Sequence, residues 1–158
     1  MRVAIICGST SDKQYADAAA ALLDSFGVTY KNFITSAHRS PNLTVKIASL
    51  VEKEFDIAIV IAGLSAALPG IIAAHTKKPV LGVPVASDLL GLDALFSIAQ
   101  MPRGIPVASF GIGKKGAQNA ALFAVRILAL KDESLGEKLQ EYIRREEEKI
   151  RKLNEPID

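Results

Sequence analysis

The stretch RVAIICGSTSD, residues 2–12, joins a short apolar run to a turn of small polar residues. An apolar run of this length, without alternating polar positions, is typical of a strand buried on both faces. The next segment, DKQYADAAAALLDSFG (12–27), has alanine and leucine at helical spacing and ends on Gly27, a plausible helix stop. A buried strand followed at once by a helix predicts one unit of a parallel sheet.

The same alternation recurs along the rest of the chain. Further strands are predicted at 28–33, 56–62, 79–85 and 105–112, and further helices at 41–55, 71–76, 92–100 and 117–130. These strands are too apolar to be half exposed, so helices should cover both faces of a five-stranded parallel sheet. No repeat, low-complexity tract or linker divides the 158 residues, which predicts a single α/β domain over 1–158.

The last two helices point to self-association. AQNAALFAVRILAL (117–130) is apolar nearly all round, so a subunit interface is expected to bury it in a homo-oligomer. A charged helix over about 132–153 carries only a thin apolar stripe. Such a helix is usually a solvated face, and the alternative is that its stripe packs on a neighbouring subunit.

Composition excludes several classes of function. The net charge of +2 gives no case for nucleic acid or an anionic membrane, and no stretch is long enough to span a bilayer. The short apolar run at the N-terminus does not read as a signal peptide, so a soluble, cytoplasmic protein is expected. Cys7 is expected to be a small buried hydrophobe, and two separated histidines give no metal-site spacing.

Ligands of such sheets bind at the carboxyl ends of the strands, so the loops that follow the strands are the candidate site. Four of them carry small or polar residues: GSTSD (8–12), SAHRSP (36–41), GLSAALPG (63–70) and ASDLLGLD (86–93). We expect these loops to converge on one crevice.

The first loop has the features of an anion-binding turn. Gly8 allows close backbone approach, Ser9 and Ser11 offer hydroxyls, and the following helix presents free N–H groups. Asp12 would repel a phosphate and suits sugar hydroxyls, so the combination suggests a ribose phosphate. The alternative is that Ser11 or Asp12 merely caps the helix. The loop matches neither dinucleotide-binding nor Walker A spacing.

The second loop sets an imidazole beside a guanidinium. Arg39 suits a phosphate, and His38 can move protons near neutral pH. The alternative is a solvated loop with two incidental charges. His75 is expected to be a helix C-terminal residue rather than a catalytic one.

Several motifs in order resemble one family. CGSTSD, SAHRSP, LPGIIAAHT, PVLGVPV and LDALFSIAQMPRGIPVASFGIG together resemble the catalytic subunit of phosphoribosylaminoimidazole carboxylase, from residue 2 to about 130. The bacterial form is the N5-carboxyaminoimidazole ribonucleotide mutase of purine biosynthesis. The resemblance implies a three-layer flavodoxin-like (Rossmann-like) fold and a homo-octamer with sites near subunit boundaries. It also implies an aminoimidazole ribonucleotide substrate, no metal and no organic cofactor.

The resemblance also assigns roles by motif. Ser9, Ser11 and Arg39 would hold the phosphate, and Asp12 the ribose hydroxyls. His38 would be the proton carrier. The remaining substrate-binding residues implied are Gly8 in the first loop, Ser36 and Ala37 at the base, and Gly63, Leu64, Ser65, Ala66 and Leu68 in the loop that excludes water.

The third loop departs from the bacterial mutases. AGLSAALPG (62–70) is about two residues shorter than their loop and lacks its histidine. Its length is closer to enzymes that carboxylate the ribonucleotide directly with carbon dioxide, whereas Arg39 and QMPRGIPV (100–107) resemble the mutases. The mutase is therefore the leading hypothesis, with a separate ATP-dependent synthase as a possible source of its substrate. The alternatives are a direct carboxylase, a carboxylase of another nucleotide, and a non-catalytic nucleotide-phosphate binding module.

Overall fold

The centre of the protein is a parallel sheet, seen in a computed structural model that describes residues 2–154. The strands are β1 (Arg2–Cys7), β2 (Thr29–Ile34), β3 (Ile57–Ala62), β4 (Val80–Pro84) and β5 (Ala108–Ser109). They pair in the order β2-β1-β3-β4-β5, and every pairing is parallel. This is the flavodoxin-like order, in which the direction of winding reverses between β1 and β3. The predicted fold class is confirmed.

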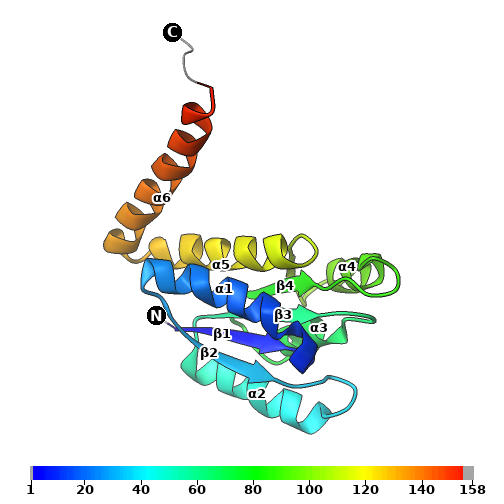
Figure 1. Cartoon of the computed structure of the whole chain (residues 1–158). Helices are drawn as coiled ribbons and strands as arrows, with labels where there is room; N and C mark the ends of the chain where they lie inside the picture. The colour runs from blue at the N-terminus through cyan, green and yellow to red at the C-terminus, as the bar shows by residue number, and fades with distance from the viewer. Residues whose placement is uncertain (1, 155–158) are drawn as a thin grey trace.

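Helices cover both faces of the sheet and make three layers (Figure 1). They are α1 (Lys13–Phe26), α2 (Pro41–Glu54), α3 (Ala67–Ala74), α4 (Leu92–Ala99), α5 (Lys114–Ala129) and α6 (Glu133–Lys152), with a short 3-10 turn η1 (Thr10–Asp12) before α1. α1 and α5 share one buried cluster with the sheet, and α2, α3 and α4 share the other.

β1, β3 and β4 alternate between these two clusters, which explains their continuous apolar sequences. The edge strands β2 and β5 are mostly exposed, so the prediction of burial on both faces is wrong for them. Val3 and Ile5 of β1 face α1 and α5, whereas Ala4 and Ile6 face the opposite layer. All six residues of β3 are buried. Gly27 ends α1 in the left-handed conformation (φ 73°), as its position in the sequence predicts.

Three predicted elements have clearly different bounds. The helix predicted at 71–76 is α3, which begins four residues earlier, at Ala67, and ends at Ala74, because a proline is tolerated in the first turn of a helix. The strand predicted at 105–112 shrinks to β5, which forms only two ladder pairs, Leu81 with Ala108 and Gly82 with Ser109. Pro106 has no N–H to donate to a ladder, and β5 is an edge strand, so the apolar pattern there overstates the strand. α5 begins three residues earlier than predicted, at Lys114, because Gly113 (φ 76°) provides the turn into it.

α5 is not buried all round within the protomer. Its buried face consists mainly of glycine and alanine, which pack on α1 and the sheet and let the two helices approach closely. Phe123, on another face, is 42% exposed. The burial of that remaining face at a subunit interface stays a prediction.

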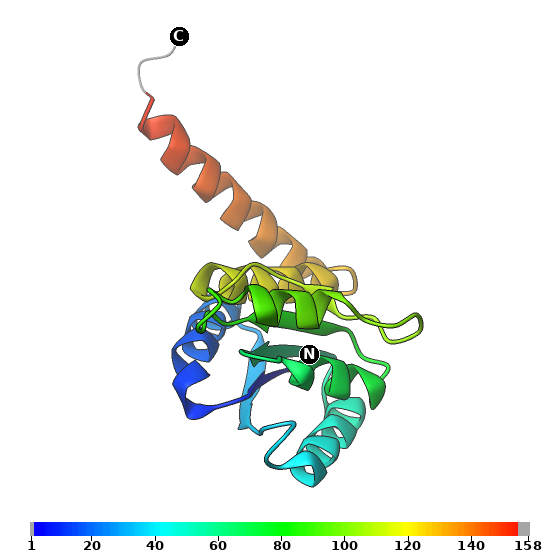
Figure 2. The same cartoon turned by 90° about the vertical axis from the view of Figure 1, so that its right-hand side faces the viewer.

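α6 extends away from the three layers in both views (Figures 1 and 2). Its first turns are anchored: Leu135 is buried, and Lys138 Nζ donates to the carbonyl of Phe26, 3.1 Å away. Farther along, Ile143, Ile150 and Leu153 are exposed. The ion pairs expected of a charged helix are present, Glu141 with Arg145 at 2.8 Å and Glu148 with Lys152 at 3.3 Å. Among the described residues, no helix is long and apolar enough to cross a membrane.

Candidate active site

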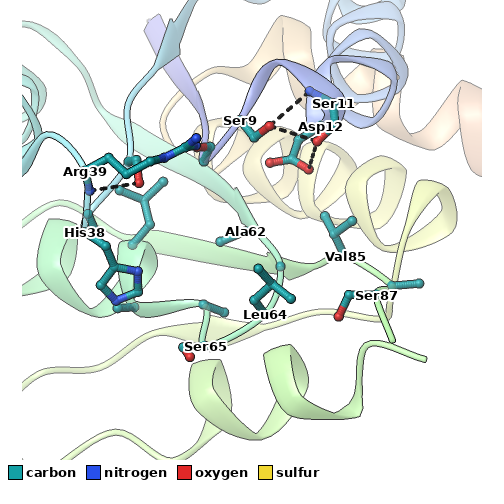
Figure 3. Close-up of a pocket in the computed structure, with 18 residues that line it drawn as sticks. Ser9, Ser11, Asp12, His38, Arg39, Ala62, Leu64, Ser65, Val85 and Ser87 are labelled. Carbon is teal, nitrogen blue, oxygen red and sulfur yellow. Dashed lines mark hydrogen bonds between the residues drawn. The ribbon is translucent and has the colours of Figure 1, made fainter. Parts of the chain in front are cut away.

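The carboxyl ends of β1, β2, β3 and β4 surround a cavity of about 660 Å³ (Figure 3). The four loops expected to converge do converge there. Every residue that the sequence put in the site lines this cavity: Gly8, Ser9, Ser11, Asp12, Ser36, Ala37, His38, Arg39, Gly63, Leu64, Ser65, Ala66 and Leu68. The roles of these residues stay predictions, since shared geometry does not test them.

The first loop turns sharply after β1. Gly8 N–H donates to the carbonyl of Ile61 at 3.0 Å, which ties the loop to the end of β3. Ser9 caps the short η1 turn by accepting from Ser11 N–H, and the Ser9 and Ser11 hydroxyl oxygens lie 2.8 Å apart. The two hydroxyls therefore sit together on the cavity wall, as an anion-binding turn requires.

Asp12 is a buried carboxylate that does not cap α1. It occupies the N-cap position, but its side chain makes no capping hydrogen bond, which argues against the capping interpretation for this residue. Only 6% of Asp12 is exposed, and burial raises the pKa of its carboxyl, while hydrogen bonds from Ser11 and Ser9 partly offset this rise. A carboxylate kept in this environment without a capping role is available to accept hydrogen bonds from a ligand.

A network of hydroxyls shapes the second loop. The buried Thr35 donates its N–H to the carbonyl of Cys7 at 2.9 Å, which fixes the start of the loop against β1. Ser40 occupies the N-cap position of α2, but its side chain does not cap the helix. Its Oγ accepts from the N–H of Ser36 and donates to the carbonyl of Ser36 instead. Ser36 Oγ in turn accepts from Arg39 N–H at 3.2 Å. The loop is thus rigid where it carries His38 and Arg39.

His38 and Arg39 extend in different directions from neighbouring positions (Figure 3). The Arg39 guanidinium reaches toward the first loop, with Nη2 3.5 Å from the carbonyl of Gly8. Among residues 2–154 no carboxylate pairs with Arg39, so its charge is available to an anion beside Ser9 and Ser11. The imidazole of His38 is exposed at the same cavity.

The shortened third loop is strained. Leu64 (φ 56°) and Ala66 (φ 32°) both adopt the left-handed conformation that non-glycine residues rarely take. Only four residues separate the end of β3 from the start of α3, so the chain has little freedom to turn. Each such residue costs about 1–3 kcal/mol, and strain of this kind concentrates at functional sites. Leu64 is exposed at the cavity, whereas Ala66 and Leu68 are buried beneath it.

Sequence reasoning missed part of the cavity wall. The additional lining residues are Ala62, Ala67, Val85, Ala86 and Ser87. The last three belong to the loop after β4, which the position of that strand had already marked as a candidate. The resemblance assigned these residues no role.

Residues expected to be structural are structural. His75 follows the last turn of α3 as its C-cap, and its Nδ1 lies 2.9 Å from the carbonyl of Ile71. Cys7 is buried, and burial, with the nearby Asp12 charge, raises the pKa of its thiol to about 12. No group of three or more potential metal ligands occurs among the described residues.

Comparison with known proteins agrees with this geometry. The sequence model of the family described as AIR carboxylase matches residues 2–149. The chain belongs to the AIR carboxylase family. The predicted resemblance is thereby confirmed, and the match covers the four loops of the cavity.

Relatives within the AIR carboxylase family are similar over nearly their whole lengths. The chain is 46% identical to a protein of Methanocaldococcus jannaschii over 155 residues, 98% of this chain and 96% of that one. It is 43% identical to a protein of Escherichia coli K12 over 157 residues, 98% and 93% of the two chains. Both relatives are named N5-carboxyaminoimidazole ribonucleotide mutase. A crystal structure of Treponema denticola PurE superposes with a TM-score of 0.87 at 32% identity, covering 96% of this chain and 94% of that one.

Proposed function

We propose that this protein is an N5-carboxyaminoimidazole ribonucleotide mutase of purine biosynthesis. The reaction moves a carboxylate from the exocyclic nitrogen of the aminoimidazole to ring carbon C4. The observation that carries the proposal is the cavity itself. An imidazole and a guanidinium that has no carboxylate partner within residues 2–154 line it together with the serines of the first loop. The names of relatives at 43–48% identity support the same reaction.

The phosphate of the ribonucleotide would bind Arg39 and the hydroxyls of Ser9 and Ser11. A guanidinium beside neighbouring hydroxyls suits a phosphate because both offer N–H or O–H donors to its oxygens. The ribose hydroxyls would donate to Asp12, whose carboxylate makes no capping hydrogen bond. Ser36 and Ala37 would lie along the base, which brings C4 toward His38.

His38 would act first as an acid and then as a base. As an imidazolium it protonates the exocyclic nitrogen as the N–C bond breaks, and carbon dioxide leaves with no charge. The electron-rich C4 then attacks carbon dioxide and becomes tetrahedral, carrying both its hydrogen and the new carboxylate. The neutral imidazole removes that proton, which restores the aromatic ring and regenerates the acid.

The third loop would keep carbon dioxide in the cavity. Leu64, Ala66 and Leu68 make that side of the cavity apolar, and an apolar wall limits the water that competes for a reactive intermediate. The short loop also motivates the second candidate, a direct carboxylase that takes carbon dioxide from solution. The two candidates share the cavity, the ribonucleotide and His38, and differ in the carboxyl donor.

The test is product formation by the purified protein from two starting points. One reaction contains N5-carboxyaminoimidazole ribonucleotide without added bicarbonate, and the other contains aminoimidazole ribonucleotide with high bicarbonate. Efficient turnover of the first alone supports the mutase. Efficient turnover of the second at modest bicarbonate contradicts it in favour of the direct carboxylase. If neither substrate reacts, the chemistry of the family does not apply to this chain.

The proposal extends to the setting of the enzyme. We expect a cytoplasmic homo-octamer with its sites near subunit boundaries. The exposed part of α6 and the uncovered face of α5 support self-association, since they leave apolar side chains such as Phe123 and Ile150 in solvent in a lone protomer. A mutase also needs a supply of its carbamate substrate, and an ATP-dependent carboxyaminoimidazole ribonucleotide synthase would provide it.

A further inference from the structure

Ser87 and Asp93 form a pair at the wall of the cavity. Ser87 lines the cavity from the loop after β4, and its hydroxyl donates to the Asp93 carboxylate, with Oγ and Oδ2 3.2 Å apart. Asp93 lies in the first turn of α4. Within residues 2–154 its side chain has no cationic partner, and its buried Oδ1 has no hydrogen-bond partner. Within residues 2–154, Ser87 is therefore the one hydrogen-bond partner of the Asp93 side chain.

The backbone between the two residues holds them together. Leu90 (φ 58°) and Gly91 (φ 83°) are both left-handed, and Leu90 N–H donates to the carbonyl of Ser87 at 2.9 Å. A Cβ on Gly91 would lie 3.1 Å from the Cα of Ala86, so the end of this loop packs closely against its beginning. This tight turn brings Asp93 back to Ser87, six residues earlier, and leaves the pair little freedom to separate.

The hydrogen bond decides what Ser87 offers to a ligand. Its only proton points at Asp93, so the lone pairs of Oγ remain for the cavity, and Ser87 acts there as a hydrogen-bond acceptor. The wall at Arg39, by contrast, offers donors. Arg39 and Ser87 lie at opposite sides of the cavity (Figure 3). The cavity therefore favours a ligand that has an anionic group at one end and an N–H or O–H donor at the other.

We infer that Ser87, oriented by Asp93, accepts a hydrogen bond from the exocyclic N–H of the substrate's base. The inference rests on the proposed function, which identifies the ligand as an aminoimidazole ribonucleotide. In that base the exocyclic nitrogen carries the N–H donors, because one ring nitrogen bears the ribose and the other is an acceptor. The sugar hydroxyls have Asp12 as their acceptor, near the phosphate-binding serines. Ser87 is then a binding residue, and Asp93 is a positioning residue that acts through it.

The test compares the affinities of two ligands by titration calorimetry. Aminoimidazole ribonucleotide has the exocyclic nitrogen, and imidazole ribonucleotide lacks it. The intact protein should prefer the amino compound by about three- to tenfold, the range expected of one neutral hydrogen bond. Ser87→Ala should remove the preference, and Asp93→Asn should reduce it. Adding Asp93→Asn to Ser87→Ala should change nothing further, because the aspartate acts only through the serine.

A matched control separates this role from loss of a nearby charge. Asp88 is the exposed neighbour of Ser87, and no hydrogen bond or ion pair of its side chain occurs within residues 2–154. Asp88→Asn removes the same charge from the same loop and should keep the preference intact. Thermal midpoints verify that each variant is folded. Should Asp93→Asn fail to fold, the Ser87→Ala result decides alone.

The outcomes distinguish failure of this inference from failure of the proposed function on which it rests. If both ribonucleotides bind and Ser87→Ala keeps the intact protein's preference, the inference is wrong and the proposed function stands. An Asp93→Asn protein that is folded and retains the full preference shows that Asp93 is merely structural. If the intact protein binds neither ribonucleotide, the proposed function is wrong and the inference falls with it.

Discussion

His38 is the single residue on which the proposed chemistry depends. Replacing it with Asn keeps the approximate size and polarity of the side chain but removes the imidazole that would donate and accept the proton. Turnover should fall by about 10²- to 10⁴-fold, as expected for loss of a general acid–base group. Ribonucleotide affinity should stay within a few-fold of the intact protein, because the phosphate and ribose contacts remain. Steady-state rates and calorimetry measure the two quantities, and unchanged turnover would favour the non-catalytic binding module.

Asp12 should lower the stability of the folded protein near neutral pH while it contributes to ligand binding. Burial raises the pKa of its carboxyl above the ordinary 3.8, so the folded protein holds this proton more tightly than the unfolded chain. Its contribution to stability is full below 3.8 and is lost as pH rises through the raised pKa. Asp12→Asn has no such loss, so its thermal midpoint should exceed that of the intact protein by more at pH 7 than at pH 4.

The same substitution should weaken ligand binding. An amide carries no charge and accepts at one oxygen only, so hydrogen bonds from ribose hydroxyls lose strength, and ribonucleotide affinity should drop by about tenfold. Equal affinities of Asp12→Asn and the intact protein would remove Asp12 from the ribose site. A thermal advantage that does not vary with pH would contradict the linkage argument.

At the residue scale, the sequence predicted which polar residues would line the cavity, and their roles stay predictions. Serine, histidine and arginine in loops after apolar strands are visible because such side chains have few other reasons to cluster there. Ser87 was not singled out, because one serine in an apolar loop carries no signal until its hydroxyl is placed against Asp93. That contact depends on two left-handed residues, one of them a leucine, which no residue preference predicts.

Two helical glycines should respond oppositely to alanine. In α5, a Cβ on Gly116 would lie 1.5 Å from the carbonyl oxygen of Gly111, so the backbones must separate. In α6, nothing lies within 4 Å of a Cβ on Gly136. Gly116→Ala should destabilise the fold by about 3 kcal/mol or more, whereas Gly136→Ala should stabilise it by about 0.5–1 kcal/mol through helix propensity. Denaturant unfolding measures both, and the same sign for the two variants would contradict the packing.

At the element scale, the predicted and observed bounds agreed best where the apolar pattern was strongest. β1 and β3 are buried on both faces and pair with two neighbours, so their apolar runs have a single explanation, and their predicted bounds differ by at most one residue. The predictions were wrong for β5 and for the starts of α3 and α5, since prolines and glycines interrupt the pattern there. Gly111 and Gly116 are only five residues apart, and their close approach depends on the left-handed turn at Gly113 between them, which the apolar pattern does not predict.

At the scale of the whole molecule, the exposed apolar stripe of α6 allows a test of whether this helix takes part in assembly together with α5. Ile150 is 63% exposed in the protomer, so Ile150→Gln removes no internal packing and keeps good helix propensity. The substitution should weaken the oligomer by at least tenfold while leaving the protomer's circular dichroism unchanged. Arg151→Gln, about 100° around the helix axis, is the control. Analytical ultracentrifugation over a dilution series measures assembly, and identical profiles for both variants would exclude Ile150 from the interface.

The labelling rate of the buried Cys7 thiol should report how often the sheet opens locally. The thiol lies at the end of β1, 4.0 Å from the carbonyl of Asp12, and burial raises its pKa to about 12. Only the thiolate reacts with disulfide reagents, so labelling at neutral pH should wait for β1 and the first loop to separate. A ribonucleotide held by that loop should slow labelling in proportion to its occupancy. The labelling rate of this one native cysteine thus reports both transient opening of the core and ligand binding, without any added probe.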